Sequence, residues 1–302
     1  MGENSRLFQS DEAESYGDNV SLTTEAPVDR KSIIREACAE FLGTMILVLI
    51  GDGVVCQTVV SQSLELMNAQ KKEIDPDLSS YAGDWSTISM GYGIALMIGL
   101  YISAGVSGGH LNPAVTVAMC RHKKLPWKKA PYYIGAQFAG AFVGALLVYI
   151  DYYVGLKELD SWEIGTAGIF ATYPKEHMGL MSGFFDELLG SFLLLLGIFA
   201  ITDKFNNEAE NGLKPVVIGL LLSGIALSFG YNTGFALNPA RDFSPRLFTA
   251  MAGWGGQVFT YANGYFLVPI TAPFIGALAG AEVYTYLISR HHPPAYVSSE
   301  SA

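Results

Sequence analysis

Six long apolar segments, separated by shorter polar stretches, dominate the pattern along the 302-residue chain. A helix that spans a bilayer needs about 20 consecutive, mostly apolar residues, and each segment has about that length or more. The segments are residues 34–60, 86–105, 130–152, 181–202, 214–231 and 265–289. The pattern therefore predicts an all-α membrane protein with six transmembrane helices.

The composition supports this class. Charged residues make up only 15% of the chain, whereas soluble domains average about 25%. Part of the net charge of −10 comes from an acidic, Ser-rich N-terminal segment, residues 1–32, which we expect to be a disordered tail. The sequence has no basic stripe that would indicate a nucleic-acid partner. Its three cysteines, Cys38, Cys56 and Cys120, match no metal-binding spacing and are expected to be buried free thiols.

One tripeptide occurs twice, as Asn112-Pro113-Ala114 and as Asn238-Pro239-Ala240. Asn is a favoured N-cap and Pro suits the first position of a helix, so each copy predicts the start of a short helix. About ten apolar residues follow the first copy, too few to cross a bilayer, and the segment after the second copy is shorter and more polar. We therefore expect two re-entrant half-helices.

Other phrases are also repeated. Glu40-Phe41-Leu42-Gly43-Thr44 opens the first span, and Glu187-Leu188-Leu189-Gly190-Ser191 opens the fourth. Gly140-x-x-x-Gly144 in the third span corresponds to Gly276-x-x-x-Gly280 in the sixth, and this symmetry suits close packing between the two halves. Each half has three spans, an odd number, so the second half must enter the membrane from the opposite side. Such inverted repeats place a functional site near the midplane.

Basic residues predict the orientation of the chain. Lys and Arg gather in segments that six spans would place on one side: Arg30, Lys31, Arg35, Arg121, Lys123, Lys124, Lys128, Lys129 and Arg290. Because short cytoplasmic loops are enriched in Lys and Arg, both termini should be cytoplasmic. The loops near residues 61–85 and 153–180 should then face outward.

The two half-helices together predict a selective passage. Their N-termini each carry about half a positive charge, so cations and hydronium are repelled where they meet. The amides of Asn112 and Asn238 can donate hydrogen bonds to a passing oxygen, which interrupts a chain of waters that could carry protons. Carbonyl acceptors along this passage are expected from the loops before the two motifs, at Gly108, Gly109, His110, Leu111, Gly234 and Ala236.

With these motifs, the chain resembles the major intrinsic protein family, the aquaporins, and specifically the aquaglyceroporins. The resemblance covers an aquaporin-like channel domain of about residues 33–290, with repeat halves at 33–152 and 181–290, followed by a cytoplasmic tail, 291–302. It implies a homotetramer in the plasma membrane with a pore in each subunit. Each pore would conduct water, glycerol and small neutral solutes such as urea, and exclude protons and ions. It implies no enzymatic activity, cofactor or metal.

The resemblance also implies a selectivity filter of Tyr92, Ala226, Phe235 and Arg241. Water-selective members usually have histidine where this chain has Ala226, and the smaller side chain widens the pore. Two aromatic faces opposite one arginine form an amphipathic slot that suits a polyol. Asp242 is similar to the residue of glycerol-conducting members, and we expect it to pair with Arg246 or Arg241 and so to hold the loop.

Glu40 and Glu187 lie in predicted spans. A carboxylate inside a membrane is costly unless its oxygens are satisfied. The resemblance implies that each accepts backbone N–H bonds from one re-entrant loop and braces it. Asp186 is the alternative to Glu187 at the second position.

Other functions remain open at this point. Within the channel class, the alternative is a water-selective pore with little glycerol flux. A proton- or ion-coupled transporter would need titratable groups in the pathway, whereas the expected midplane charge is positive. A membrane enzyme is disfavoured, because the predicted spans contain no Ser/His/Asp, Cys/His or metal-ligand constellation.

Overall fold

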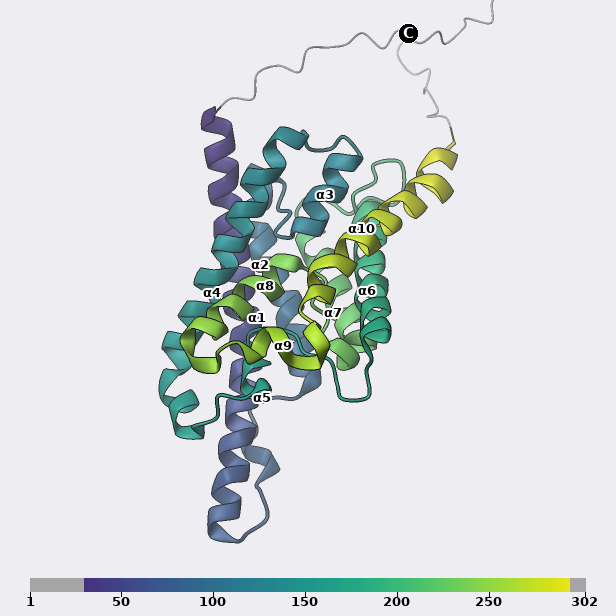
Figure 1. Ribbon diagram of the computed structural model, residues 1–302. Coiled ribbons are helices and arrows are strands. Elements are labelled where there is room, and N and C mark those ends of the chain that lie inside the picture. The colour runs from purple at the N-terminus through teal and green to yellow at the C-terminus, as the bar shows by residue number, and fades with distance from the viewer. Residues whose placement is uncertain (1–29, 294–302) are drawn as a thin grey trace, which may run out of the picture.

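The computed structural model describes residues 30–293, which form a bundle of helices (Figure 1). Six of the helices are long and apolar enough to cross a membrane, which confirms the predicted number. They are α1 (Arg30–Lys72), α2 (Trp85–Ser107), α4 (Ala130–Leu159), α6 (Leu180–Ile201), α7 (Lys214–Thr233) and α10 (Leu267–Leu287). Most of the two expected tails, residues 1–29 and 294–302, lies outside the described residues.

The shorter elements include the two expected half-helices, α3 (Pro113–Arg121) and α8 (Pro239–Thr249). At 11 residues, α8 is longer than the 9-residue α3, so the expectation of a shorter second half-helix was wrong. The polar side chains of α8 are compatible with a longer helix because they form hydrogen bonds with other buried groups. The remaining elements are α5 (Ile164–Ala167), α9 (Gln257–Gly264), a π-helical turn (Ala250–Trp254) and 3-10 turns at Leu78–Ser80, Trp127–Lys129 and Ser289–His291.

The first helix is much longer than its apolar segment. It continues 12 residues past position 60 and projects from the bundle together with the segment before α2 (Figure 1). Three hydrogen bonds hold this extension: the Gln62 amide donates to the Gly83 carbonyl at 2.8 Å, the Ala82 N–H donates to the Ser61 hydroxyl at 3.0 Å, and the Asp77 N–H donates to the Glu65 carboxylate at 3.1 Å. Hydropathy alone could not predict the extension, because most of its residues are polar.

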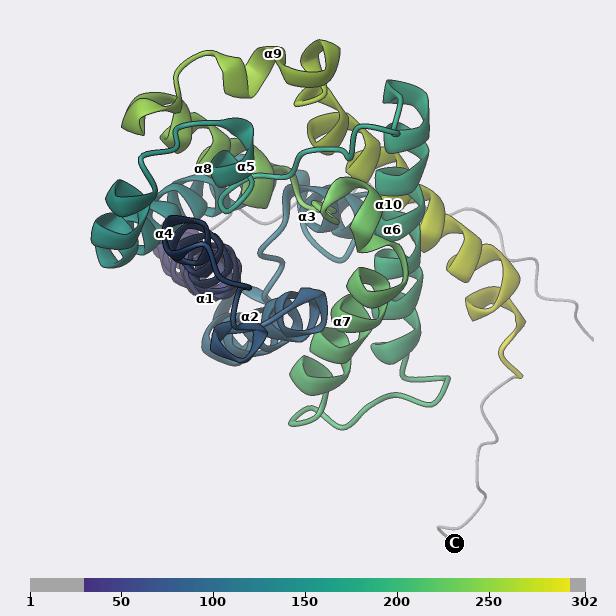
Figure 2. The ribbon, with the colours of Figure 1, turned by 90° about the horizontal axis from the view of Figure 1, so that it is seen from below.

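Among the long helices, α1 packs against both α4 and α2, α2 also packs against α7, and α6 packs against α10, as Figure 2 shows from below. A Cβ atom at Gly140 would overlap the Phe41 carbonyl of α1, and one at Gly276 would overlap the Leu188 carbonyl of α6. The glycine motifs therefore bring helices together within each half, and the expectation that they pack between halves was wrong. The halves meet instead along α2 and α7, where a Cβ at Gly219 would lie 2.5 Å from the Gly93 carbonyl.

The two ends of the described chain, the start of α1 and the end of α10, lie on the same side of the bundle (Figure 1). Cys56 and Cys120 are buried free thiols as expected, whereas Cys38 is exposed on α1. An exposed thiol in that helix does not conflict with a membrane protein, because lipid covers such surfaces.

Candidate functional site

The repeated tripeptides begin the two half-helices. Asn112 caps α3, and its side-chain oxygen accepts the Ala114 N–H at 2.8 Å. Asn238 caps α8 in the same way, accepting the Ala240 N–H at 3.0 Å. In both helices proline occupies the start, where its missing N–H has no intrahelical partner to lose. The sequence thus dictates both helix starts locally.

The two caps also bond to each other's loops. The Asn112 amide donates to the Leu237 carbonyl at 2.9 Å, and the Asn238 amide donates to the Leu111 carbonyl at 2.8 Å. Leu111 and Leu237 both have left-handed backbones, with φ of 52° and 50°. Each amide nitrogen carries two hydrogens. One hydrogen fixes the junction, and the second remains for another acceptor.

Two buried glutamates brace the loops that approach this junction. Glu40 of α1 accepts the His110 N–H at 2.9 Å and the Leu111 N–H at 2.7 Å. Glu187 of α6 accepts the Ala236 N–H at 2.9 Å and the Leu237 N–H at 2.8 Å. These bonds compensate the cost of left-handed φ at the two leucines, which is roughly 1–2 kcal/mol for each residue.

The adjacent carboxylate, Asp186, makes different contacts. It accepts hydrogen bonds from the Asn232 amide at 3.0 Å and the Thr233 hydroxyl at 2.7 Å. Glu187, and not Asp186, therefore makes the bonds to the N–H groups of the second re-entrant loop.

Two cavities lie in line on either side of a narrow point. The inner cavity, of about 120 Å³, extends along both re-entrant loops and past both Asn side chains to Thr202. Such a cavity has room for several water molecules. The outer cavity has the larger volume, about 510 Å³. Of the six residues expected to offer carbonyls, the inner cavity is lined by Gly108, Gly109, His110, Leu111 and Ala236, and the outer cavity by Gly234.

Tyr92, Phe235 and Arg241 line both cavities and therefore form the constriction between them. The Tyr92 and Phe235 rings meet edge to face, with centroids 5.3 Å apart. The Arg241 guanidinium carbon lies 4.5 Å from the Tyr92 ring centroid. The Tyr92 ring thus contacts both the Phe235 ring and a fixed cation, and the three side chains line the same constriction.

Ala226, the fourth predicted filter residue, is fully buried in α7 and is not among the residues that line either cavity. Its carbonyl accepts the indole N–H of Trp85 at 3.2 Å. Trp85 in turn packs edge to face on Phe235 and lines the outer cavity. The sequence analysis did not identify Trp85, because an aromatic residue at the first position of a span is also typical of a membrane interface.

Asp52 is a second residue that the sequence analysis missed. This buried carboxylate of α1 accepts hydrogen bonds from the Tyr92 hydroxyl and, at 3.3 Å, from Nη1 of Arg241. Arg241 Nη1 also donates to the Phe170 carbonyl at 3.0 Å. A lone acidic residue between two glycines of an apolar span was the signal that could have revealed it, since ionisable residues in spans are by default functional.

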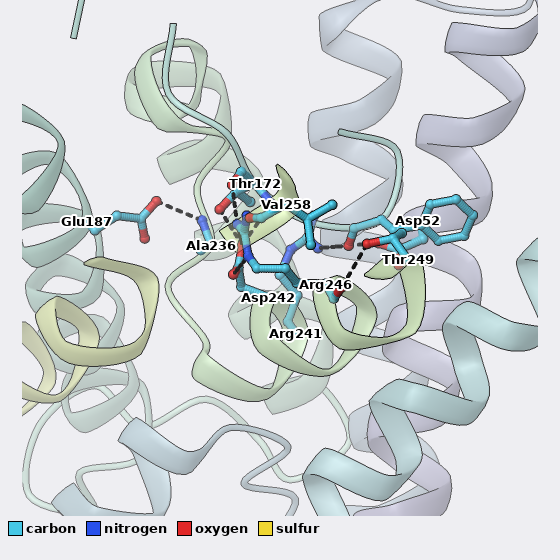
Figure 3. Close-up of polar contacts among 10 residues, drawn as sticks. Asp52, Thr172, Glu187, Ala236, Arg241, Asp242, Arg246, Thr249 and Val258 are labelled. Carbon is cyan, nitrogen blue, oxygen red and sulfur yellow. Dashed lines mark hydrogen bonds and ion pairs between the residues drawn. The ribbon is translucent and has the colours of Figure 1, made fainter. Parts of the chain in front are cut away.

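Asp242 pairs with Arg246, and not with Arg241. Its carboxylate accepts from Arg246 Nε at 2.9 Å and from both the N–H and the hydroxyl of Thr172, at 2.7 and 2.6 Å. Arg246 also donates to the Thr172 and Val258 carbonyls. Figure 3 shows this cluster beside Arg241. It ties α8 to the loop whose Phe170 carbonyl holds the filter arginine.

Six apolar helices and two half-helices joined through their N-terminal caps, with cavities on both sides of a constriction, define a membrane channel built from an inverted repeat. The family model described as major intrinsic protein matches residues 28–284. The chain belongs to this family.

The relatives agree with this assignment. The chain is 43% identical to "Aquaporin-9" of Homo sapiens over 270 residues, which cover 87% of this chain and 86% of the relative. It is 44% identical to "Aquaglyceroporin-2" of Rhizophagus irregularis, over 84% of this chain and 77% of the relative. Among solved structures, the aquaglyceroporin from Plasmodium falciparum superposes with a TM-score of 0.74 at 34% identity, covering 85% of this chain and 98% of that one.

Proposed function

We propose that this protein is a passive channel for water, glycerol and small neutral solutes such as urea, and that it excludes protons and ions. The names of its relatives, "Aquaporin-9" and "Aquaglyceroporin-2", support this activity. Solute passes from the outer cavity through the constriction and along the re-entrant loops. No step requires a reaction, a cofactor or a metal.

The junction of the half-helices supports the exclusion of cations. Because both N-termini point at one place, their partial positive charges add where a cation would have to pass. Asn112 and Asn238 each retain one amide hydrogen for a solute oxygen. A water bound to both must turn its lone pairs toward them, so it cannot relay a proton along the file.

One observation favours glycerol over water alone: the apolar rings of Tyr92 and Phe235 and the guanidinium of Arg241 line the same constriction. A polyol has a carbon face and a hydroxyl face, and this slot offers apolar surface to one and a donor to the other. The small side chain of Ala226, where histidine would narrow a pore, supports the same proposal.

We further propose that the channel is a homotetramer in the plasma membrane with both termini in the cytoplasm. The two ends of the described chain lie on the same side of the bundle, which supports placing both termini on one side of the membrane (Figure 1). The Lys and Arg residues of the loops on that side support its being cytoplasmic. Protease protection of tagged termini in sealed cells, and the mass of the purified protein by light scattering, test these two points.

Stopped-flow light scattering on purified protein in liposomes tests the proposed solute range. We expect fast shrinkage in inward gradients of both glycerol and sucrose, followed by rapid reswelling in glycerol only. Fast shrinkage without reswelling in glycerol would instead make the pore water-selective.

A further inference from the structure

The constriction has a buried acidic residue directly behind it. Asp52 lies in α1 between Gly51 and Gly53, and its side chain is fully buried. It lines neither cavity, so a solute does not touch it. Any influence on permeation must therefore act through the residues that Asp52 contacts.

Those contacts are two of the filter residues. The Tyr92 hydroxyl and Arg241 Nη1 donate to the same oxygen, Oδ1 of Asp52. The Tyr92 ring lies flat against α1 at Gly51, where a Cβ atom would overlap the ring. Asp52 thus fixes the hydroxyl end of the ring, Gly51 makes room for the ring beside α1, and the guanidinium carbon of Arg241 lies 4.5 Å from the ring centroid.

Stability alone does not account for the carboxylate. Its second oxygen, Oδ2, is buried and has no hydrogen-bond partner within the described part of the chain. Leaving a buried acceptor unsatisfied is costly, and buried ion pairs are often no more stable than apolar groups of the same volume. The cluster is therefore better explained by where it holds Tyr92 and Arg241 than by a gain in folding free energy.

We propose that Asp52 is a positioning residue that sets the solute range of the channel. It holds the Tyr92 ring against α1 and anchors one nitrogen of Arg241 on the side away from the slot, so that the constriction stays wide enough for a polyol. This inference rests on the proposed glycerol conduction.

The tests are Asp52→Leu, which removes both acceptors at similar volume, and Asp52→Asn, which retains one acceptor oxygen without the charge. Freed from Asp52, the Tyr92 ring and the Arg241 side chain move into the slot. For Asp52→Leu we expect the ratio of glycerol to water permeability to fall by about tenfold, which corresponds to about 1.4 kcal/mol, because both hydrogen bonds that hold the ring and the guanidinium in place are lost. Asp52→Asn should fall between the wild type and Asp52→Leu.

Tyr92→Phe tests the path of the effect. It removes the hydroxyl that donates to Asp52, so it should lower the same ratio. In the Tyr92→Phe background, Asp52→Leu should then lower the ratio by less than it does in the wild type. The matched control is Asp151→Asn, at an exposed position on α4, which should leave the ratio unchanged. Thermal unfolding in detergent accompanies each variant.

The outcomes separate this inference from the proposed function. If the wild type does not conduct glycerol, the proposed function fails. If the wild type conducts glycerol and Asp52→Leu folds with an unchanged ratio, only the role of Asp52 is overturned. Should Asp52→Leu not fold, unchanged ratios in both Asp52→Asn and Tyr92→Phe overturn it equally.

Discussion

Replacing Glu187 by leucine tests whether a single carboxylate holds the second re-entrant loop in place. The change removes the acceptor of the Ala236 and Leu237 N–H groups, which lie in a buried loop. An unsatisfied buried donor costs about 1–3 kcal/mol, so two of them cost roughly 2–6 kcal/mol. That is a large part of a typical folding free energy of about 5–15 kcal/mol.

The assay is thermal unfolding in detergent, followed by water permeability of the folded fraction. Asp186→Leu is the control, because Asp186 precedes Glu187 on the same helix but accepts only from the Asn232 and Thr233 side chains. We expect Asp186→Leu to cost no more than about 1–2 kcal/mol. A Glu187→Leu protein as stable as wild type, or more stable than Asp186→Leu, would refute the assignment of the brace.

Three further predictions follow from individual contacts. Phe235→Cys should make water flux sensitive to mercurials, whereas the wild type, in which no cysteine lines either cavity, should resist them; block of the wild type that survives removal of Cys38, Cys56 and Cys120 would contradict this. Arg246→Lys should lower the stability in detergent by about 1–3 kcal/mol, because lysine cannot reproduce the bonds to Asp242, Thr172 and Val258 together; unchanged unfolding would contradict it. Burial acts to raise the pKa of Asp203, but hydrogen bonds from His292, the Phe205 N–H and Tyr284 outweigh it and hold the pKa below its ordinary value. Because the folded pKa is the lower one, this contact stabilises the C-terminal end of α10 at neutral pH and is lost as the pH falls below about 4. Hydrogen exchange of residues 284–292, corrected for intrinsic rates, should rise only in that range, and a rise already between pH 7 and 5 would contradict it.

Much of the fold could be predicted because its signals are local. Apolar runs predicted the spans, and an Asn-Pro pair is enough to start a helix, so the starts of α3 and α8 were readable from the chain. The extension of α1 to Lys72 was not, because it depends on contacts with residues 82 and 83 and carries no apolar run.

The site divides in the same way. The resemblance to the aquaporins implied Tyr92, Phe235 and Arg241, whose places follow from the two motifs. Asp52 belongs to a helix that contains no motif, and its role depends on a contact 189 residues away in the sequence. The pairing of Asp242 with Arg246 was one of two options, and the sequence could not choose because both arginines are near in the chain. The structure decides it, since Arg241 turns toward Asp52.

The account's central claim is that glycerol passes through the protein by passive permeation. The most direct test measures uptake of labelled glycerol into proteoliposomes under an imposed pH gradient and, separately, an imposed membrane potential. A channel predicts fast equilibration to the external concentration, with the same rate and end point under every gradient. Accumulation of glycerol above the external concentration would contradict the account, because only a coupled transporter can concentrate its solute.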